Sequence, residues 1–320
     1  MKSPHQTLRP FRLAAAALAL LASSTGPLAR AQTAVPQAQQ RHFNSPDEAL
    51  KALKIATMAG DRTAIDAIFG PDVKDLLSGD PRQDAIEFAS FAKSLGLYAQ
   101  WVRKADDRFV LDIGDQNWPM PIPLVGGAGA WHFDTAAGKE EVLNRRIGED
   151  EINAIGVCRA YVQAQREYAA EDRDGTGTLK YAQRLKSAPG SKDGLYWPVA
   201  PGEDPSPFGP LVADARAEGY GGKTAEGAPQ PYKGYHFRIL TAQGASAPGG
   251  AYNFIINGNM VAGFALVAFP AHWGESGVMT FIVNQWGKVY ECNLGEHSSE
   301  IAGAMDSFDP DAGWSPVPAQ

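Results

Sequence analysis

The chain has 320 residues with a formal net charge of −7, and 44% of its residues are hydrophobic. This apolar content is typical of folded domains and excludes a largely disordered chain. Lys and Arg are scattered along an acidic sequence, whereas a nucleic-acid-binding protein needs a basic stripe on one face. We therefore expect no nucleic acid among its partners.

The first 31 residues have the pattern of a cleavable signal peptide. Lys2, Arg9 and Arg12 precede an uncharged run at residues 13–22, and small residues then lead to Ala31. We expect cleavage before Gln32 and release to the periplasm or the exterior, without a lipid anchor, because no Cys stands at the cleavage point. The alternative is an uncleaved N-terminal anchor.

The mature chain is more acidic than the precursor. Residues 1–31 carry four basic and no acidic side chains, so their removal takes the formal charge from −7 to −11. No later segment is both long and free of charge, and we expect no membrane span after cleavage. The remaining chain is long enough for two domains.

Helix signals open the first predicted domain, residues 43–148, which follows a disordered leader at 32–42. Ser45 can cap a helix that begins with Pro46, and Glu48 can close the capping box. Two further helices are predicted at 63–69 and 82–95. Apolar residues at helical spacing predict the buried faces of the first and third helices: Leu50, Leu53, Met58, Ile86, Phe88, Phe91 and Leu95.

Strand signals complete the first domain. Residues 101–113 and 130–134 alternate apolar and polar side chains, as half-buried strands do. Residues 118–123 between them contain three prolines, which belong at a sheet edge or in an extended lip. Helices followed by a strand meander resemble the cone-shaped α+β domain of the nuclear-transport-factor-2 type (NTF2-like).

The second predicted domain, residues 149–314, opens with the longest helix, at 149–171, and is followed by a tail at 315–320. One side of that helix is expected to be buried through Ile152, Ile155, Cys158, Val162 and Tyr168. Hairpin turns are predicted at 257–259 and 285–287, where Asn and Gly allow tight turns. Strands are predicted at 234–240, 251–257, 260–269, 278–284 and 288–294.

One long helix followed by an irregular loop and an antiparallel meander resembles the globular part of pilins and pseudopilins. The helix is charged along its length, so the resemblance implies a shared shape and no filament. The predicted fold class is α+β with two domains, an NTF2-like one and a pilin-like one.

The chain as a whole is similar to a bacterial family called "domain of unknown function 2950". The resemblance extends from residue 43 to residue 314 and implies an exported envelope protein without an established activity. The Cys158 and Cys292 positions depart from the family pattern. Seven segments carry the resemblance: 118–125 (WPMPIPLV), 131–147 (WHFDTAAGKEEVLNRRI), 164–168 (AQREY), 193–198 (DGLYWP), 206–212 (SPFGPLV), 219–220 and 260–284.

Cys158 and Cys292 have two alternative interpretations. Export to an oxidising compartment allows them to form a disulfide. Alternatively, Cys158 is a small buried hydrophobe on the apolar side of the long helix.

A metal site is the first candidate for chemistry, at residues 171–177. Asp172 and Asp174 stand beside two glycines there, as in a calcium loop. Ala170 and Tyr181 occupy the ends where an EF-hand has ligands, so a loop that caps the long helix explains the same residues. No cofactor is expected apart from calcium at this loop.

A basic and aromatic cluster is the second candidate. Arg145 and Arg146 can form a clamp for a carboxylate or phosphate at the mouth of the first domain. Alternatively, they lie on a solvated helix and pair with Glu141 or Glu149 four positions away. Trp118, Trp131 and Lys139 complete the cluster, with Glu140 and Glu151 nearby in sequence.

An aromatic groove is the third candidate, built from Tyr196, Trp197, Trp273 and Trp286. The alternative places these rings in the core beneath loops. The segment at residues 272–277 holds His, Glu and Ser, but a glycine turn explains it better than a catalytic triad, whose members converge from different directions.

The leading hypothesis is a non-catalytic binding or assembly module of the cell envelope, with an envelope protein or a cell-wall component as its partner. The sequence contains no Gly-x-Ser-x-Gly, His-Glu-x-x-His, Walker or Cys-x-x-Cys motif. The alternative is a periplasmic small-molecule hydrolase with a site between the two domains. That enzyme would need His132, His236 or His272 beside an acid and a hydroxyl.

Overall fold

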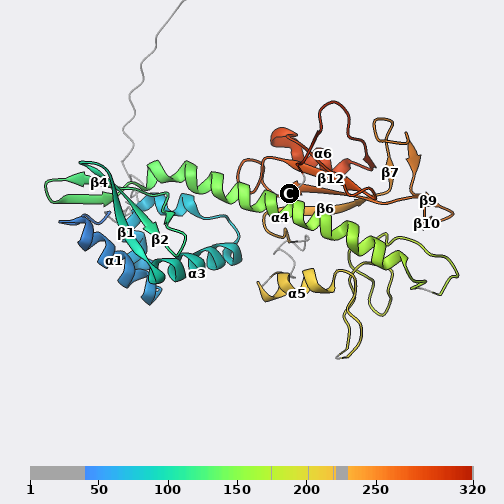
Figure 1. Cartoon of the computed structure of the whole chain (residues 1–320), viewed down its shortest axis with the longest axis horizontal. Helices are drawn as coiled ribbons and strands as arrows, with labels where there is room; N and C mark the ends of the chain where they lie inside the picture. Colours follow the sequence, from blue (N-terminus) through green and yellow to red (C-terminus); the bar gives the residue numbers. More distant parts are fainter. Residues whose placement is uncertain (1–39, 174, 201, 219, 221–229, 319–320) are drawn as a thin grey trace, which may run out of the picture. The chain divides into compact units, whose positions relative to one another are not determined.

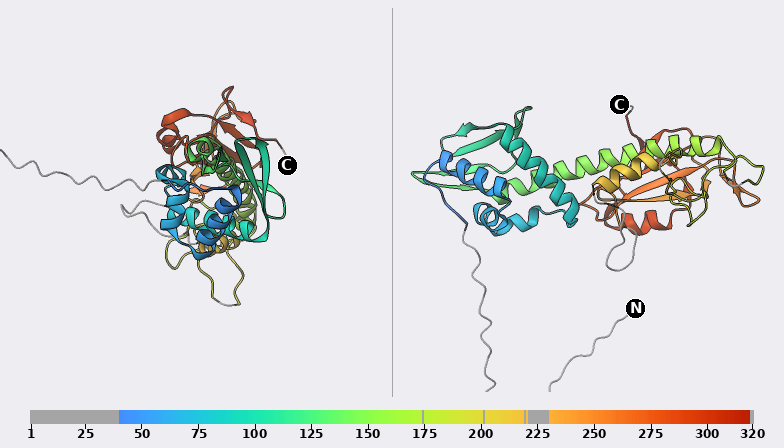
Figure 2. Two further views of the ribbon diagram at one scale, coloured as in Figure 1. Left: turned by 90° about the vertical axis from the view of Figure 1, so that its left-hand side faces the viewer. Right: turned by 90° about the horizontal axis from the view of Figure 1, so that it is seen from below.

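The computed structural model describes residues 40–173, 175–200, 202–218, 220 and 230–318, and Figures 1 and 2 show its elements. The predicted signal peptide at 1–31, the leader up to residue 39 and residues 319–320 of the predicted tail lie outside the described residues. The contacts begin before Phe43, because the Gln40 side chain donates to the Phe133 carbonyl at 2.6 Å. Residues 40–42 therefore belong to the folded body and not to the leader.

Three α-helices and a 3₁₀ turn open the fold: α1 (Pro46–Ala59), α2 (Arg62–Phe69), η1 (Pro71–Leu76) and α3 (Pro81–Leu97). The predicted cap at Ser45 is confirmed, since its hydroxyl accepts the Glu48 N–H at 3.2 Å. Glu48 does not return the bond to Ser45, because its carboxylate accepts the Asn44 N–H instead. Asp61 caps α2 in the same way.

The predicted buried faces of α1 and α3 are partly correct. Leu53 and Leu95 are fully buried, and Phe91 packs partly buried against the same core, as do Leu50 and Phe88. Met58 and Ile86 are 56% and 41% exposed, so their predicted burial is wrong. The Met58 methyl group lies over Gly96 at the surface of α3, and Ile86 borders a cavity.

The first sheet is an antiparallel meander in the order β1-β2-β4-β5, with β3 paired to β2. The predicted strands at 101–113 and 130–134 are therefore confirmed, the first as a hairpin. The proline-rich segment contributes only the short β3 and otherwise runs without strand pairing. The strands are β1 (Ala99–Ala105), β2 (Arg108–Ile113), β3 (Trp118–Pro119), β4 (Leu124–Gly127) and β5 (Ala130–Phe133).

The longest helix, α4 (Thr135–Ala169), begins 14 residues before the predicted start at Glu149. Asp134 caps it by accepting the Ala137 N–H at 3.1 Å. Its early turns carry few apolar residues, so periodicity alone did not indicate them. The predicted domain boundary between 148 and 149 consequently falls inside one continuous helix (Figure 1).

The second half packs α4 against a sheet in the order β15-β13-β12-β11-β6. The predicted strands at 234–240, 278–284 and 288–294 are confirmed as β6, β12 and β13. The helix α5 (Gly209–Ala217) precedes this sheet, and α6 (Ser298–Ala304) follows β13. The strands are β6 (Tyr235–Leu240), β11 (Ala265–Pro270), β12 (Thr280–Asn284), β13 (Val289–Cys292) and β15 (Ser315–Pro316).

The two strands predicted at 251–257 and 260–269 are each interrupted. The first divides into β8 (Tyr252–Asn253) and β9 (Ile255–Ile256), and the second into β10 (Asn259–Met260) and β11. The predicted turn at 257–259 is confirmed, because Asn257 and Gly258 have φ of 50° and 80° between β9 and β10. A second small sheet contains β8 with β7 (Ala242–Gln243) and β14 (Ser307–Phe308).

Two clusters of buried apolar side chains hold the described residues together. The first gathers residues between Phe43 and Phe133, and the second gathers residues between Ala154 and Phe308. On α4, Ile155, Cys158, Val162 and Tyr168 are buried as predicted, whereas Ile152 is 59% exposed, contrary to prediction. Helices and antiparallel sheets confirm the α+β class.

Of the helices in the described ranges, none has the length and apolar character to cross a membrane.

Candidate functional site

A cavity of about 640 Å³ lies beneath α3, and we name it the α3 cavity. Helices α2, α3 and α4 contribute to its wall, together with η1 and the chain from β2 to Ile122. Much of its lining is apolar, whereas charged side chains stand among the lining residues of α2, α3 and α4 and at Asp115. The apolar wall includes Ile65, Phe69, Phe88, Phe91, Ile113, Met120 and Ile122.

The cavity exists because α3 is only partly covered. Leu95 is the one buried residue of this 17-residue helix. Phe88 and Phe91 face the cavity in a half-buried state, and Ile86 stays exposed at its border. An amphipathic helix is normally stabilised by burying its apolar face, so an apolar occupant would complete the burial of α3.

Arg145 and Trp118 form one part of the cavity wall, as the predicted basic and aromatic cluster required. The guanidinium carbon lies 4.5 Å from the Trp118 ring centroid, a cation–π contact. Arg145 also donates to Glu141 at 2.6 Å and to the Pro119 carbonyl at 2.9 Å. Trp118 is 43% exposed, so its ring is accessible to a ligand.

Arg146 lines the same cavity but faces different partners. It is 7% exposed, donates to the Leu76 carbonyl, and its Nε lies 3.6 Å from Glu87. Both arginines thus have carboxylate neighbours already, Glu141 for Arg145 and Glu87 for Arg146. The structure brings Trp118, Arg145 and Arg146 to one cavity without the open clamp that the sequence predicted.

The other members of that predicted cluster lie elsewhere. Trp131 is buried in the first core, edge-on to Phe109. Lys139 pairs with Asp75 at 2.8 Å on the surface. Glu151 accepts the N–H groups of Val278 and Met279 at 2.9 and 3.0 Å, which ties α4 to the second sheet.

Asp150, one residue before, is a buried acid that the sequence analysis missed. It is 1% exposed and accepts a 3.0 Å hydrogen bond from Gln83 on α3. Burial is the main reason that its pKa rises to about 7, with Glu87 and Glu149 adding to the increase and Arg146 opposing it. Asp150 stands in a run of charged residues on one helix, and nothing in that run distinguishes its buried position from those of its solvated neighbours.

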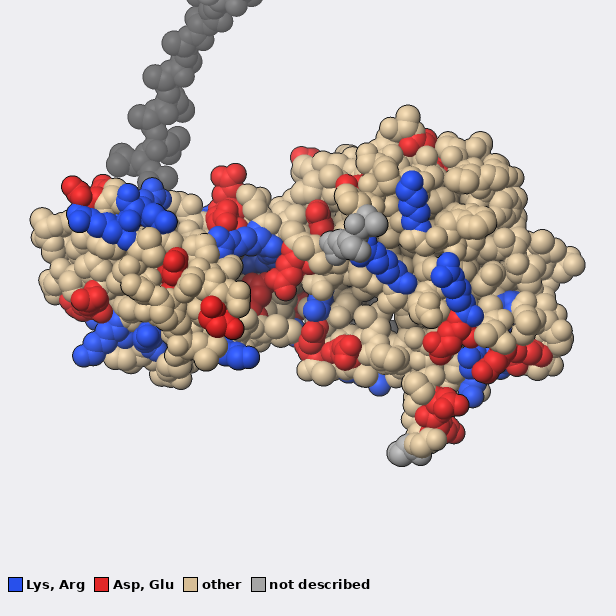
Figure 3. Space-filling view, in the orientation of Figure 1, with Lys and Arg blue, Asp and Glu red and all other residues tan. Residues whose placement is uncertain are grey.

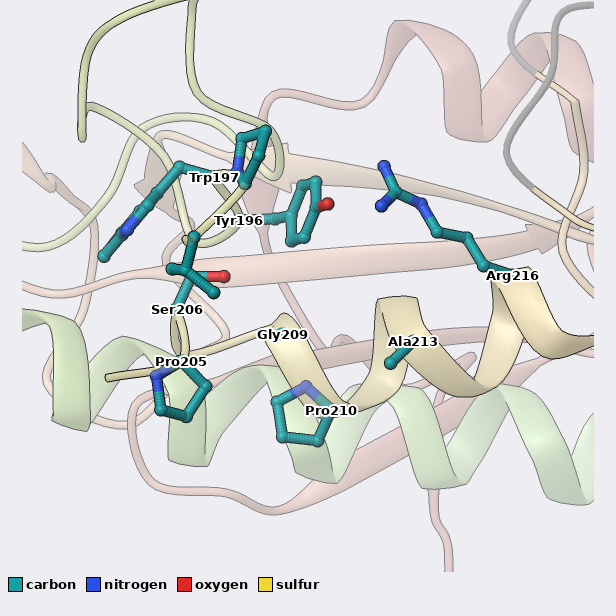
Figure 4. A pocket seen from close by; sticks show the side chains of 10 residues that line it. Tyr196, Trp197, Pro205, Ser206, Gly209, Pro210, Ala213 and Arg216 are labelled. Carbon is teal, nitrogen blue, oxygen red and sulfur yellow. The ribbon is translucent and has the colours of Figure 1, made fainter. Parts of the chain in front are cut away.

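A second cavity of about 390 Å³ lies along α5, and we name it the α5 pocket (Figure 4). It contains two of the predicted groove residues, Tyr196 and Trp197, which are 8% and 6% exposed. Its other lining residues are mostly prolines and small side chains, with Arg216 over the Tyr196 ring at 5.1 Å. Aromatic side chains here line a pocket and also fill the core, so both sequence interpretations apply.

The two remaining groove residues do not line this pocket. Trp273 donates its indole N–H to the Asn293 side chain at 2.9 Å. Trp286 stands in the β12–β13 turn and is 71% exposed. The predicted groove of four aromatic rings is therefore not assembled.

The cysteines are both free thiols in the structure. Cys158 is fully buried in the second core, where burial raises the pKa of its thiol to about 12. Cys292 ends β13 in a half-exposed state. This arrangement corresponds to the interpretation of Cys158 as a small buried hydrophobe, and the disulfide alternative is not formed.

The predicted calcium loop has a structural role at Asp172. Its carboxylate accepts the N–H groups of Thr176 and Gly177 at 3.2 and 2.7 Å, so it organises the loop after α4. Asp174 lies outside the described residues. Within the described ranges, no three His, Cys, Asp or Glu side chains are grouped as metal ligands.

Within the described residues, none of the histidines named for the hydrolase alternative hydrogen-bonds an acid or a hydroxyl through its ring. The Ser276 hydroxyl bonds the His272 backbone rather than its ring. His236 stacks against Phe269, and burial lowers its pKa, with His272 adding to this effect. His132 packs against His42 at 5.1 Å. The hydrolase stays a prediction without assigned residues.

Charge on the visible face in Figure 3 is mixed, with Lys and Arg interspersed among Asp and Glu.

Comparison with known proteins gives one match. Residues 40–317 match the family described as "Protein of unknown function (DUF2950)". No curated protein and no solved structure matches the chain.

Proposed function

Because the chain belongs to the family described as "Protein of unknown function (DUF2950)", we propose a function from its own geometry. The protein is an exported, non-catalytic binding module of the bacterial cell envelope. It holds a small, largely apolar molecule in the α3 cavity, and the partly covered α3 is the observation that carries this proposal.

The size of the α3 cavity supports a small-molecule ligand. Its 640 Å³ falls within the range of about 300–1,000 Å³ that is usual for ligand sites. Such sites combine an apolar wall with a few polar groups that orient the ligand. Phe91, Ile113 and Met120 supply part of the wall, and Trp118 with Arg145 supplies an amphipathic edge.

The charges around the cavity favour a neutral ligand over an anion. Arg145 and Arg146 are held by Glu141 and Glu87, so an incoming carboxylate would compete with carboxylates already in place. Glu149 adds a further negative charge to the lining. The amphipathic edge therefore contacts the ligand through the Trp118 ring, and the third arginine of the lining, Arg62, lies over the Phe88 ring at 5.0 Å.

The resemblance of residues 43–148 to an NTF2-like cone is part of this proposal. Helices resting on a curved antiparallel sheet can enclose a ligand cavity, and α1 to α3 with β1 to β5 have that composition. The pilin-like character proposed for residues 149–314 supports an assembly or partner-binding role in the envelope for the second half.

A neutral fluorescent probe tests binding to the α3 cavity. N-phenyl-1-naphthylamine becomes fluorescent in apolar surroundings, so titration of the protein with it should give a saturable increase in fluorescence. Ser90 lines the cavity on α3, and a Ser90→Trp substitution would fill it. We expect Ser90→Trp to weaken probe binding at least tenfold, about 1.4 kcal/mol.

The matched control is Ala89→Trp, because Ala89 is an exposed neighbour on α3 that does not line the cavity. It should bind the probe like the unsubstituted protein. Thermal melting of both variants checks that each is folded, and saturating probe should raise the melting temperature of the control only. Equal probe binding by folded Ser90→Trp and Ala89→Trp would refute the proposal.

A further inference from the structure

The α5 pocket differs from the α3 cavity in its charge. None of its ten lining residues is acidic, although the whole protein has a net charge of −7. Its one charged lining residue is Arg216, on the last turn of α5. The pocket therefore has a positive character within an acidic protein.

Arg216 is exposed and lacks a carboxylate partner among the described residues. Its guanidinium lies 5.1 Å from the Tyr196 ring centroid, and Figure 4 shows the Tyr196 hydroxyl pointing toward it. Asp214, two positions before on α5, projects from a different side of the helix, because side chains two positions apart do not face each other. An incoming anion would meet a guanidinium and a phenol hydroxyl side by side.

Ser206 provides a second polar group at the other end of the pocket. The residue is 1% exposed, and its hydroxyl has no hydrogen-bond partner within the described chain. Buried hydroxyl groups are nearly always hydrogen-bonded, so this one is available to a ligand acceptor. Gly209 leaves room beside it, since a side chain there would approach the Ser206 hydroxyl to 3.3 Å.

Apolar surface separates these two polar ends. Pro210 and Ala213 lie on α5 between Ser206 and Arg216 (Figure 4). Val199, which is 39% exposed, also lines the pocket. A matching ligand has a carboxylate at one end, an apolar group in the middle and a hydrogen-bond acceptor at the other end.

We propose that the α5 pocket binds an N-acylated apolar amino acid or the carboxyl terminus of a peptide. Arg216 and Tyr196 hold the carboxylate, because guanidinium groups bind carboxylates through charge-assisted hydrogen bonds. Pro210 and Ala213 contact the apolar side chain, and Ser206 donates to the acyl carbonyl. This site is separate from the α3 cavity, since the two share no lining residue.

Two probes that differ only in their C-terminal group test this proposal. N-acetylphenylalanine carries the carboxylate, and N-acetylphenylalanine amide replaces it with a neutral group on the same apolar body. Calorimetric titration of the full chain should give a Kd at least tenfold lower for the acid. Arg216→Gln should remove this preference, and Ala213→Phe should abolish binding of the acid by filling the pocket.

The controls separate the site from general effects. Arg108→Gln removes an exposed arginine of β2 that lines neither cavity, and Ala217→Phe adds the same ring one turn further along α5, outside the pocket. Both should bind the acid like the unsubstituted protein. Ser90→Trp should also retain acid binding, which makes failure at the α3 cavity distinguishable from failure here.

Three results would overturn the proposal. The first is equal affinity for the acid and the amide, and the second is the absence of acid binding by the unsubstituted protein at millimolar concentration. The third is an acid preference that survives in folded Arg216→Gln.

Discussion

At the scale of single residues, Asp150 makes the stability depend on pH. The pKa of its buried carboxyl rises from 3.8 to about 7, so the folded state binds a proton more tightly than the unfolded state. The contribution of this carboxyl to the free energy of unfolding is therefore most favourable below about pH 4, and it is lost as the pH rises toward 7. We expect Asp150→Asn to raise the melting temperature at pH 8 relative to the unsubstituted protein, by a few degrees.

The same substitution should have little effect at pH 4, where Asp150 is protonated in the folded protein. Asp107→Asn, at an exposed position, serves as the control and should leave the pH profile of melting unchanged. A parallel shift of the melting temperature at both pH values in Asp150→Asn would mean that packing, and not the carboxyl charge, explains the effect.

At the scale of elements, α4 depends on glycine where it crosses the proline-rich segment. A Cβ on Gly138 would lie 2.7 Å from the Ile122 side chain and 2.9 Å from its Cα. Gly138→Ala should therefore destabilise the protein by about 1–3 kcal/mol, the usual cost of overpacking, although alanine favours helix. Gly148, on the same helix, has no atom within 4 Å of a Cβ, so Gly148→Ala should stabilise by about 0.5–1 kcal/mol. Chemical denaturation of both variants measures the contrast, and equal effects would contradict this account.

At the scale of the whole molecule, the predicted signal peptide would decide the compartment in which both cavities meet their ligands. The segment at 1–31 carries four basic and no acidic residues, so its predicted removal would make the chain more acidic. We expect the protein recovered from the periplasm or the medium to begin at Gln32, with an intact mass that corresponds to residues 32–320. Recovery of the complete chain from a membrane fraction would contradict cleavage.

Much of the fold was predictable because its signals are local. Ser45 indicated the start of the first helix, apolar residues at helical spacing indicated α1 and α3, and alternation over 101–113 and 130–134 indicated strands. These features act within a few residues of the chain. The start of α4 was missed because its first turns bury few apolar side chains, and charged residues carry no helical period.

The candidate sites were predictable as residue types but not as assemblies. Arg145 and Trp118 do meet at a cavity, and Tyr196 and Trp197 share another. Some of the contacts were not evident, because Glu87 reaches Arg146 from α3 and Arg216 reaches Tyr196 from α5. Trp131 was grouped with Arg145 and Trp118 because it is close to them in sequence, but it is buried in the first core. Trp273 and Trp286 were grouped with Tyr196 and Trp197 because they are aromatic, but they do not line the α5 pocket.

The sequence by itself determined most of the helices, strands and turns of the described residues, since each depends on residues that are neighbours in the chain. The tertiary structure alone decided that α3 stays half-covered, that Asp150 is buried and that Arg216 stands without a carboxylate among the described residues. These properties depend on which distant segments pack together. Only that packing decides whether a side chain is buried or has a charged partner, and hence its pKa and its availability to a ligand.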